Sequence, residues 1–234
     1  MRLPWEQSDL HPHALSLVEP DVTDPDFEHD LRQDLAAFNP PDIIHRYRVV
    51  VPDGQGTHAL SEQGFAPTRL TRLFRLPLVA TAGDPLPAQI AAHWFRPGER
   101  APWHDWIAAH WRHYRMTHTS NPPREPETGL HDVFVGDDLI EGLALRDGPM
   151  GRVRAFASLR EGQGLGWIGG APDLLPAVLA ACLRRATAIG WTHATLEVDD
   201  DDYGLWSLTD PMVEHTQMTF VTWQRERAGT VGPH

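Results

Sequence analysis

A repeat within the chain limits the possible folds more than any other feature of the sequence. Shifting the chain by 148 residues aligns positions 31–71 with positions 179–219 without a gap. Nine aligned pairs are identical: Leu31/Leu179, Leu35/Leu183, His45/His193, Val50/Val198, Asp53/Asp201, Gly56/Gly204, Leu60/Leu208, Thr68/Thr216 and Thr71/Thr219. Self-similarity at a fixed offset is the signature of a repeated structural unit. The sequence therefore predicts two related units, the first of them a partial copy.

Apolar spacing and turn residues place the elements of both copies. In the first copy we expect helices over 27–38 and 57–63 and strands over 45–51 and 68–76. In the second copy we expect helices over 103–116, 174–189 and 204–209, and strands over 88–95, 131–135, 140–146, 152–159, 165–169, 192–198 and 216–223. The common order is helix, strand, acidic turn, short helix and strand. Asp26 is the expected N-cap of the helix over 27–38, and Asp173 that of the helix over 174–189. Gly64 should end the helix over 57–63, and Gly190 the helix over 174–189.

A stretch rich in glycine and proline, 79–88, separates the copies and marks the expected domain boundary. We therefore expect a partial, degenerate half domain over residues 1–78. A complete domain should follow over 79–227, and a tail over 228–234.

The charge of the chain excludes several classes of partner. Twenty arginines and no lysine oppose 32 acidic residues, which gives a formal net charge of −12. Nucleic acids and anionic membranes both bind cationic surfaces, so neither partner is expected. The absence of lysine excludes Schiff-base chemistry, and arginine beside abundant alanine, leucine and proline is typical of a GC-rich bacterial genome. A single cysteine, Cys182, allows no internal disulfide and no paired-cysteine metal site.

The sequence shows no targeting segment. The first residues lack the apolar run of a signal peptide, and no stretch reaches the ~18 apolar residues of a membrane span. We therefore expect a soluble, cytoplasmic protein.

Several short motifs resemble one enzyme superfamily. The first copy contains Glu62-Gln63-Gly64-Phe65 ahead of a strand. The second contains Gly142-Leu143-Ala144-Leu145 and Arg154-Ala155-Phe156-Ala157-Ser158-Leu159, and then Leu165-Gly166-Trp167-Ile168-Gly169-Gly170 ahead of a helix. This series is similar to the central strands and the splayed strand of the GNAT (GCN5-related) N-acyltransferase superfamily. The resemblance implies an α/β fold with a mixed, mostly antiparallel sheet flanked by helices, preceded by a partial repeat of the same fold.

The resemblance also implies an activity and the residues that would carry it. Members transfer an acyl group from acetyl-CoA or another acyl-CoA to an amine, which here would be a small-molecule or peptide amine. Main-chain N–H groups of Ile168, Gly169 and Gly170 would position the acyl oxygen and the pantetheine arm. The helix start at Leu174 and Leu175 would bind the pyrophosphate.

One segment departs from the superfamily pattern and leaves a second function open. Where members carry Gln/Arg-x-x-Gly-x-Gly/Ala, this chain has Pro172, Asp173 and Pro176. A proline has no N–H to donate, and Asp173 as N-cap would occupy an amide and add negative charge. The alternative is therefore a non-catalytic binding or dimerisation protein of the same fold that has lost the pyrophosphate loop.

No catalytic residue is assigned by the sequence. Glu141 and His131 lie on predicted strands and are candidate general bases without a residue-level match. Tyr203 lies five residues before the position of the superfamily's frequent catalytic tyrosine, so no role is carried onto it. The acidic run at 199–202 fits a turn that caps the next helix better than it fits a calcium loop. Cys182 fits a buried position.

The aromatic stretch over 103–116 has three interpretations. Its tryptophans, Trp103, Trp106 and Trp111, could pack in the core, form a subunit interface of a homodimer or line an acceptor pocket. His110 and His113 could also present two imidazoles to a metal, but no third ligand is spaced with them, so no metal is predicted.

Overall fold

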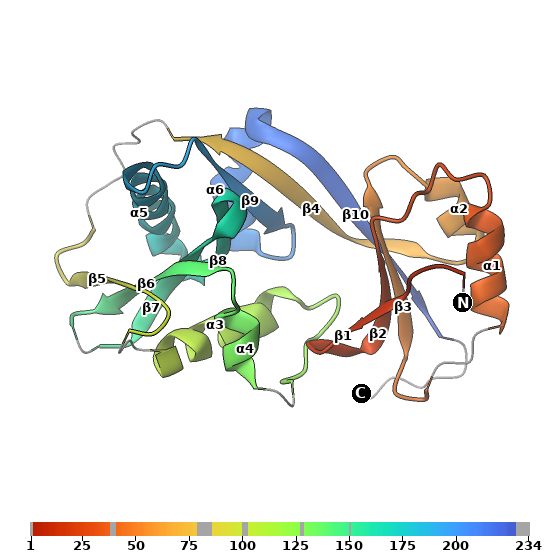
Figure 1. Cartoon of the computed structure of the whole chain (residues 1–234), viewed down its shortest axis with the longest axis horizontal. Coiled ribbons are helices and arrows are strands. Elements are labelled where there is room, and N and C mark those ends of the chain that lie inside the picture. The colour runs from red at the N-terminus through yellow and green to blue at the C-terminus, as the bar shows by residue number, and fades with distance from the viewer. Residues whose placement is uncertain are drawn as a thin grey trace. The chain divides into compact units, whose positions relative to one another are not determined.

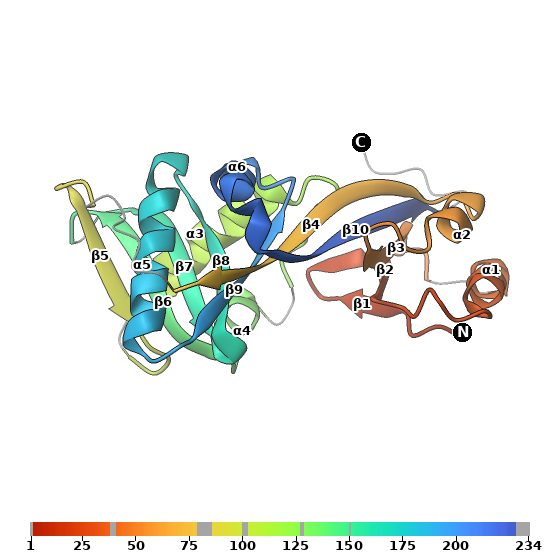
Figure 2. The same cartoon turned by 90° about the horizontal axis from the view of Figure 1, so that it is seen from above.

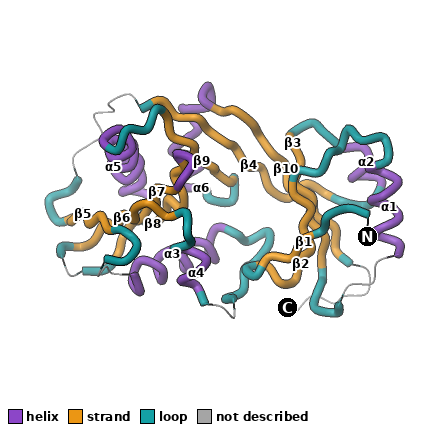
Figure 3. The backbone as a smooth tube through the Cα atoms, in the orientation of Figure 1, coloured by secondary structure: helices purple, strands orange, loops and turns teal. Residues whose placement is uncertain are grey.

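The structure is a computed structural model that describes residues 2–37, 41–78, 86–99, 103–126, 129–149 and 151–227. The chain divides into two compact units (Figure 1). The first unit comprises Met1–Thr71, Ser120–Glu127 and Met218–His234, and the second comprises Arg72–Thr119 and Thr128–Gln217. Both units contain helices and strands (Figure 3). None of the described helices combines the length and apolarity that a bilayer span requires.

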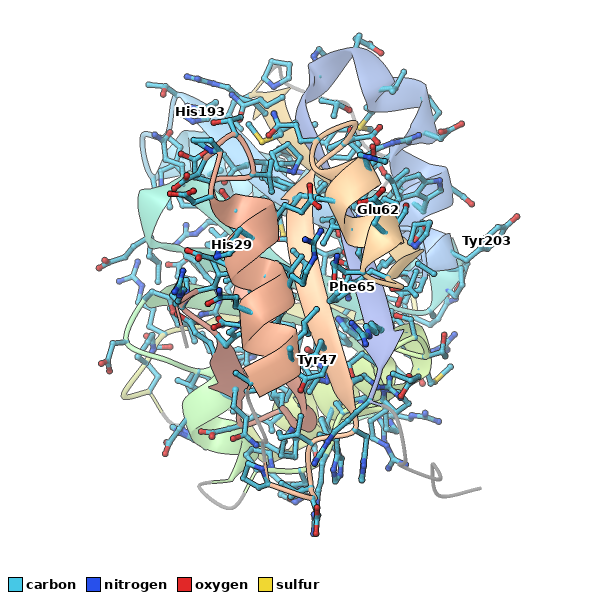
Figure 4. The ribbon with its side chains drawn as sticks, turned by 90° about the vertical axis from the view of Figure 1, so that its right-hand side faces the viewer. His29, Tyr47, Glu62, Phe65, His193 and Tyr203 are labelled. Atoms are coloured by element: carbon cyan, nitrogen blue, oxygen red, sulfur yellow. The ribbon has the colours of Figure 1, made fainter. Side chains whose placement is uncertain are left out.

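The first unit is a sheet with two helices on one face. Its strands follow the order β1 (Glu6–Ser8), β2 (His11–Val18), β3 (Arg46–Pro52), β10 (Thr216–Glu226) and β4 (Ala66–Pro77). β2 pairs with β3 in parallel, and β3 pairs with β10 antiparallel. The helices α1 (Phe27–Ala37) and α2 (Thr57–Glu62) lie in front of the strands in Figure 4. The core of this unit includes Leu17, Leu31, Val49, Val51 and Leu60, all fully buried.

The second unit contains the longer run of strands. Their order is β4, β9 (His193–Asp199), β8 (Gly164–Gly170), β7 (Val153–Arg160), β6 (Leu139–Asp147) and β5 (Ile90–Phe95). Antiparallel pairing joins β5 to β6, β6 to β7 and β7 to β8, whereas β8 and β9 are parallel. The helices are α3 (Trp103–Thr117), α4 (Leu130–Phe134), α5 (Leu175–Ala188) and α6 (Tyr203–Thr209), with 3-10 turns at Glu161–Gln163, Pro172–Leu174 and Asp210–His215.

Helices cover both faces of this sheet (Figure 2). Along β7, Ala155 and Ala157 belong to the apolar core that contains α5. Phe156, between them, stacks on His110 of α3, with ring centroids 3.9 Å apart. Because successive side chains of a strand point to opposite faces, α5 and α3 lie on opposite faces of the sheet. The predicted fold class, a mixed and mostly antiparallel sheet flanked by helices, is confirmed.

The repeated order of elements is present in the structure. α1, β3, α2 and β4 correspond to α5, β9, α6 and β10, and each pair begins within two residues of the 148-residue offset. Leu31 and Leu179 are both buried in the cores of their units. The correspondence extends further toward the N-terminus, because β2 and β3 are parallel neighbours in the first unit as β8 and β9 are in the second.

The last strand of each copy is shared between the units. β4 ends the first copy, yet from Arg72 onward it belongs to the second unit, where it is the neighbour of β9. β10 ends the second copy, yet from Met218 onward it belongs to the first unit, where it is paired with β3. Residues 79–85 of the predicted boundary and the tail over 228–234 lie outside the described residues. The domain limits 1–78 and 79–227 therefore stay a prediction.

Two local predictions are wrong. The segment 131–135 was expected to be a strand, but α4 occupies it, because Leu130, Val133 and Phe134 are spaced for one helical turn. Short apolar runs fit a strand or a helix equally well by pattern. Asp173 does not cap α5, which begins after the 3-10 turn and has no side-chain cap.

Two strands, β1 and β2, had no sequence prediction. The predicted helix over 27–38 is confirmed as far as Ala37, and Phe38 lies outside the described residues.

Candidate functional site

The parallel strands of the second unit separate soon after they meet. β8 and β9 pair only through Gly164 with Thr195 and Leu165 with Leu196. Beyond Leu165, the register of β8 continues with β7 alone. We call the part of β8 and β9 beyond these two pairs the strand opening. A separation of this kind leaves main-chain polar groups that need other partners.

The corresponding strands of the first unit stay together. β2 and β3 pair at five successive positions, from Ala14 with Arg46 to Val18 with Val50. The core side chains Leu15, Leu17 and Val49 fill the face beneath them. Among the described parallel pairs, the opening is therefore a feature of the second unit alone.

A β-bulge lies in β8 at the opening. Ser158 of β7 pairs with Gly166, and Phe156 pairs with Gly169, so Ala157 faces two residues, Trp167 and Ile168. Trp167 has a φ of 53°, an unusual value for a residue with a large side chain. A bulge leaves its extra residue unpaired and changes the direction of the strand. Such strain in a well-packed strand is often associated with function.

A histidine from α3 and an aspartate after β9 meet at the opening. His113 Nε2 lies 2.7 Å from Asp202 Oδ2. Asp202 is the N-cap of α6, and its other carboxylate oxygen accepts a hydrogen bond from Leu205 N at 3.1 Å. The His113 ring rests on Gly169, where a Cβ atom would lie 2.5 Å from His113 Cδ2 and 2.6 Å from Nε2. Gly169 is thus required by the packing of this ring against β8.

A second pair of the same type lies close by in the sequence. His118 Nε2 is 3.7 Å from Asp199 Oδ2, which is an ion-pair distance when the imidazole is protonated. The predicted role of the acidic run is confirmed, because Asp202 caps the helix that follows. Within the part of the chain that the structure describes, no group of three His, Cys, Asp or Glu side chains could hold a metal ion.

His110 and His113 have different surroundings although they lie three residues apart on α3. The His110 ring is fully buried against Phe156 and Trp106, and its Nδ1 lies 3.0 Å from the carbonyl of Trp106. Burial lowers the pKa of His110 to about 3, because the charged ring would lose its hydration. His110 is therefore a neutral core residue, and His113 is the histidine at the opening.

The expected cofactor residues lie on β8 and at the start of α5. Ile168 and Gly169 are buried at the opening, and Gly170 follows them with a φ of 119°. A Cβ at Gly170 would lie 2.4 Å from the carbonyl oxygen of Arg154, so this glycine is required for the close pairing of β7 and β8. Leu174 and Leu175 are buried in the core.

The main-chain amides at the start of α5 are already engaged. Leu174 N donates to the carbonyl of Ala171 at 2.9 Å, and the amide at Leu175 donates to the carbonyl of Pro172. Pro172 and Pro176 have no N–H. This helix start therefore offers few donors to an anion, although Asp173 does not occupy any of them as a cap.

Glu141, a candidate base, is held in an ion cluster. It is 2% exposed, and its carboxylate accepts hydrogen bonds from Arg185 Nε (2.5 Å) and Nη2 (2.6 Å) and from Arg96 Nε (2.8 Å). The hydrogen bonds from Arg185 and then Arg96 lower the pKa of Glu141 despite its burial. A carboxylate stabilised in this way is a weak base, so we assign Glu141 a structural role.

The other candidates lie apart from the strand opening or within the core. Tyr203 points outward and is 80% exposed (Figure 4). His131 is an exposed residue of α4 rather than of a strand. Cys182 is buried in α5, and burial raises the pKa of its thiol to about 12, which confirms it as a packing residue.

The tryptophans of α3 differ from one another. Trp106 is fully buried, and its Nε1 donates to the carbonyl of Leu143 at 3.0 Å. Trp103 packs edge-on against Trp106 and Phe95. Trp111 is only partly buried. Core packing therefore accounts for Trp106 and for the contacts of Trp103.

No protein-family model and no curated protein matches the chain. Among solved structures, it is similar to a GCN5-related N-acetyltransferase from Sphaerobacter thermophilus, with a TM-score of 0.62 and 17% identity. The match covers 97% of this chain and 77% of that one. The chain has the GNAT fold.

Two further GNAT-fold structures agree with this assignment. A GCN5-related N-acetyltransferase from Kribbella flavida matches at a TM-score of 0.55 and 17% identity, over 96% of this chain and 85% of that one. A tandem GNAT protein from the clavulanic acid biosynthesis pathway matches at 0.54 and 10% identity, over 81% of this chain and 66% of that one. The predicted resemblance is confirmed at the level of the fold, and the internal repeat is in keeping with a tandem relative.

An N-acetyltransferase of this fold uses an acyl-CoA, and the residues at the opening would suit one part of such a molecule. The separated strands and the bulge at Trp167 leave main-chain groups without ladder partners, which suits an extended arm that hydrogen-bonds to a strand. The diphosphate of an acyl-CoA would have few hydrogen-bond donors at the start of α5, because the amides of Leu174 and Leu175 are engaged. The opening would therefore suit an acylated thioester arm better than a diphosphate.

Proposed function

We propose that the second unit is an N-acyltransferase that takes an acyl group from acetyl-CoA or another acyl-CoA. The acceptor would be a small-molecule or peptide amine, in the cytoplasm. The observation that carries the proposal is the strand opening of β8 and β9, with a bulge on one side and the His113–Asp202 pair across it. The first unit would be a structural copy, since its β2 and β3 are paired throughout.

The chain's own residues would serve the reaction in three ways. Main-chain N–H groups of Ile168, Gly169 and Gly170 would align the donor along β8 and stabilise negative charge on the acyl oxygen. The thioester itself supplies an activated acyl group. The acceptor must lose a proton, because an ammonium group has no lone pair with which to attack a carbonyl carbon. Leu174 and Leu175 would place the start of α5 beside the donor without contributing free amides.

One observation favours the alternative, a non-catalytic GNAT-fold protein. The amides of Leu174 and Leu175 are engaged, and Pro172 and Pro176 lack donors, so the usual anion site of a helix start is weak here. A binding or dimerisation role would need no diphosphate site.

Calorimetric titration with acetyl-CoA, CoA and S-acetylpantetheine, followed by a thiol-release assay with a panel of amines, distinguishes the two functions. The proposal predicts saturable binding of both acylated donors and thiol release that depends on the amine. At 100 times its dissociation constant, a donor should stabilise the fold by about 2.7 kcal/mol. No binding of any donor at millimolar concentration would favour the non-catalytic alternative.

A further inference from the structure

We propose that His113 is the general base that takes the proton from the attacking amine, with Asp202 as the residue that positions it. This inference rests on the proposed acyltransferase function and adds to it a catalytic residue that no sequence motif indicates. Three observations support it: the direction of one hydrogen bond, the packing of the ring, and the location of the pair at the strand opening.

The hydrogen bond between the two side chains fixes which nitrogen can act as a base. An ionised carboxylate only accepts hydrogen bonds, so the 2.7 Å contact with Asp202 Oδ2 requires a proton on His113 Nε2. In the neutral ring, the other nitrogen, Nδ1, then carries the free lone pair. No hydrogen bond to Nδ1 from another described residue is present. The pair therefore has the form of a base held by an acidic partner.

Both side chains are held before any substrate binds. Asp202 is 12% exposed, and its second oxygen is fixed by the amide of Leu205 at the start of α6. The His113 ring lies close enough to Gly169 to exclude a Cβ there, and the edge of Phe156 meets it with ring centroids 5.6 Å apart. A base that is already oriented needs little reorganisation in the transition state.

The pair lies beside the strand opening, with the Cδ2–Nε2 edge of the ring against β8, so an amine would reach Nδ1 from the side of the ring that faces away from Gly169. Gly169, on which the ring rests, immediately follows the bulge at Trp167 and Ile168. His113 is also 20% exposed, so protons can exchange with solvent. The other histidines of α3 are less suitable: His110 is fully buried, and His118 lies 3.7 Å from its aspartate, too far for an orienting hydrogen bond.

The acceptor first loses its ammonium proton to solvent, and the neutral amine then attacks the acyl carbon. His113 Nδ1 accepts one proton from the amine as the new N–C bond forms with the acyl carbon. The positive charge on the ring is stabilised by the Asp202 carboxylate. The C–S bond breaks, and its electron pair leaves with the sulfur. His113 Nδ1 then returns its proton to the thiolate, which restores the neutral ring and releases a thiol.

The test compares three variants with the wild type in amine-dependent thiol release from acetyl-CoA and S-acetylpantetheine. His113→Gln should lower kcat about 100-fold or more with little change in donor binding by calorimetry, as expected for loss of a general base. His118→Gln is the matched control and should retain activity. In His113→Ala, added imidazole should restore part of the rate, an effect that loss of packing alone would not give.

Asp202→Asn provides a readout that does not depend on turnover. Asparagine caps helices as well as aspartate, so α6 should persist. With its oxygen on Leu205 N, the substituted side chain would present an NH₂ group to His113. Imidazole ¹⁵N spectra should then show the ring proton on Nε2 in the wild type and on Nδ1 in this variant. The variant should be impaired in kcat although His113 is present.

The outcomes separate the two proposals. Donor binding and transfer that survive His113→Gln would overturn the role of His113 and leave the acyltransferase function standing. A wild-type ring with its proton on Nδ1 would also overturn it. Absence of transfer by the wild type with every amine would overturn both.

Discussion

Replacing Glu141 with glutamine removes a buried negative charge from between two guanidinium groups. Arg185 donates two hydrogen bonds to this carboxylate and Arg96 donates one, which ties α5 and the segment after β5 to β6. A glutamine with its oxygen in place of Oε1 can keep the contacts from Arg96 Nε and Arg185 Nη2, but the contact from Arg185 Nε is lost and the NH₂ group would face that cation. This cluster stabilises the fold and contains no proposed catalytic group, so Glu141→Gln should weaken the fold without removing the catalytic base.

The magnitude follows from the exposure of the partners. Breaking a buried ion pair costs about 3–5 kcal/mol when the remaining charge is also buried. Here Arg185 is 33% exposed and Arg96 is 60% exposed, so water can solvate both after the change. We therefore expect a loss of about 2–3 kcal/mol in the free energy of unfolding at pH 7. For a chain of this size, that corresponds to about 4–12 °C in Tm.

The loss should also depend on pH in a defined direction. The pKa of Glu141 is lowered in the folded state from an ordinary value of 4.5, so the charged carboxylate stabilises the fold above that value. This contribution is lost as the pH falls through the lowered pKa. The difference between wild type and variant should therefore be full at pH 7 and shrink in acid below pH 4.5.

Urea unfolding followed by tryptophan fluorescence measures the effect. Asp147→Asn is a matched control on the same strand, because Asp147 pairs with Arg154 at 3.1 Å on the surface, where such pairs contribute about 0–1 kcal/mol. If Glu141→Gln were no more destabilising than Asp147→Asn, the assignment of Glu141 to the stability of the fold would be refuted.

Three further predictions concern the opening and the core beneath it. Gly169→Ala should cost about 1–3 kcal/mol by forcing the His113 ring away, whereas Gly164→Ala, which meets nothing closer than 3.7 Å, should be nearly neutral in urea unfolding. The free energy of unfolding should decline as the pH falls from 6.5 toward 3, because burial lowers the pKa of His110 to about 3 and the unfolded chain then binds the extra proton. In His110→Phe the free energy of unfolding should depend less on pH over this range. An equal pH dependence in wild type and variant would contradict this assignment. Acetyl-CoA and S-acetylpantetheine should bind within about tenfold of each other by calorimetry, since the amides of Leu174 and Leu175 are engaged, and a 100-fold preference for acetyl-CoA would show that the diphosphate has a strong site.

Local patterns in the sequence predict most elements of the second copy. β6, β7 and β8 follow from alternating apolar residues and from the turns at Asp147-Gly148-Pro149 and 161–164. α5 follows from its apolar face, with Pro176 in the first turn and Gly190 after the end. These signals are local, so one sequence is enough to detect them.

The features that local patterns do not predict depend on tertiary contacts. β1 is only three residues long and pairs with β2, which contains Pro12. The repeat predicts that β4 and β10 correspond, but not where along each strand the change from one unit to the other falls. Which strand pairs with which is decided by packing over the whole sheet, and that information is not present in the spacing of either strand.

The site was only partly predictable for the same reason. The sequence predicts a cofactor role for Gly169 and Gly170. The structure shows another reason for glycine at these positions, since His113 packs against Gly169 and β7 packs against Gly170. His113 and Asp202 are 89 residues apart, and the sequence singles them out separately, one in a pair of histidines and the other in an acidic turn, with nothing to connect them. The predicted capping role of the acidic turn was the available signal for Asp202, because a capping carboxylate after a strand is both fixed and close to the strand end.

Hydrogen exchange of the main-chain amides, with and without acetyl-CoA or S-acetylpantetheine, would show whether a donor binds in the strand opening. If the donor lies in the strand opening, protection should appear in β8 from Gly166 to Gly170 and in α3 around His113. The amides of β2 between Ala14 and Val18 should not change, because β2 and β3 are already paired. Protection in β2, or none in β8 at saturating donor, would contradict the account.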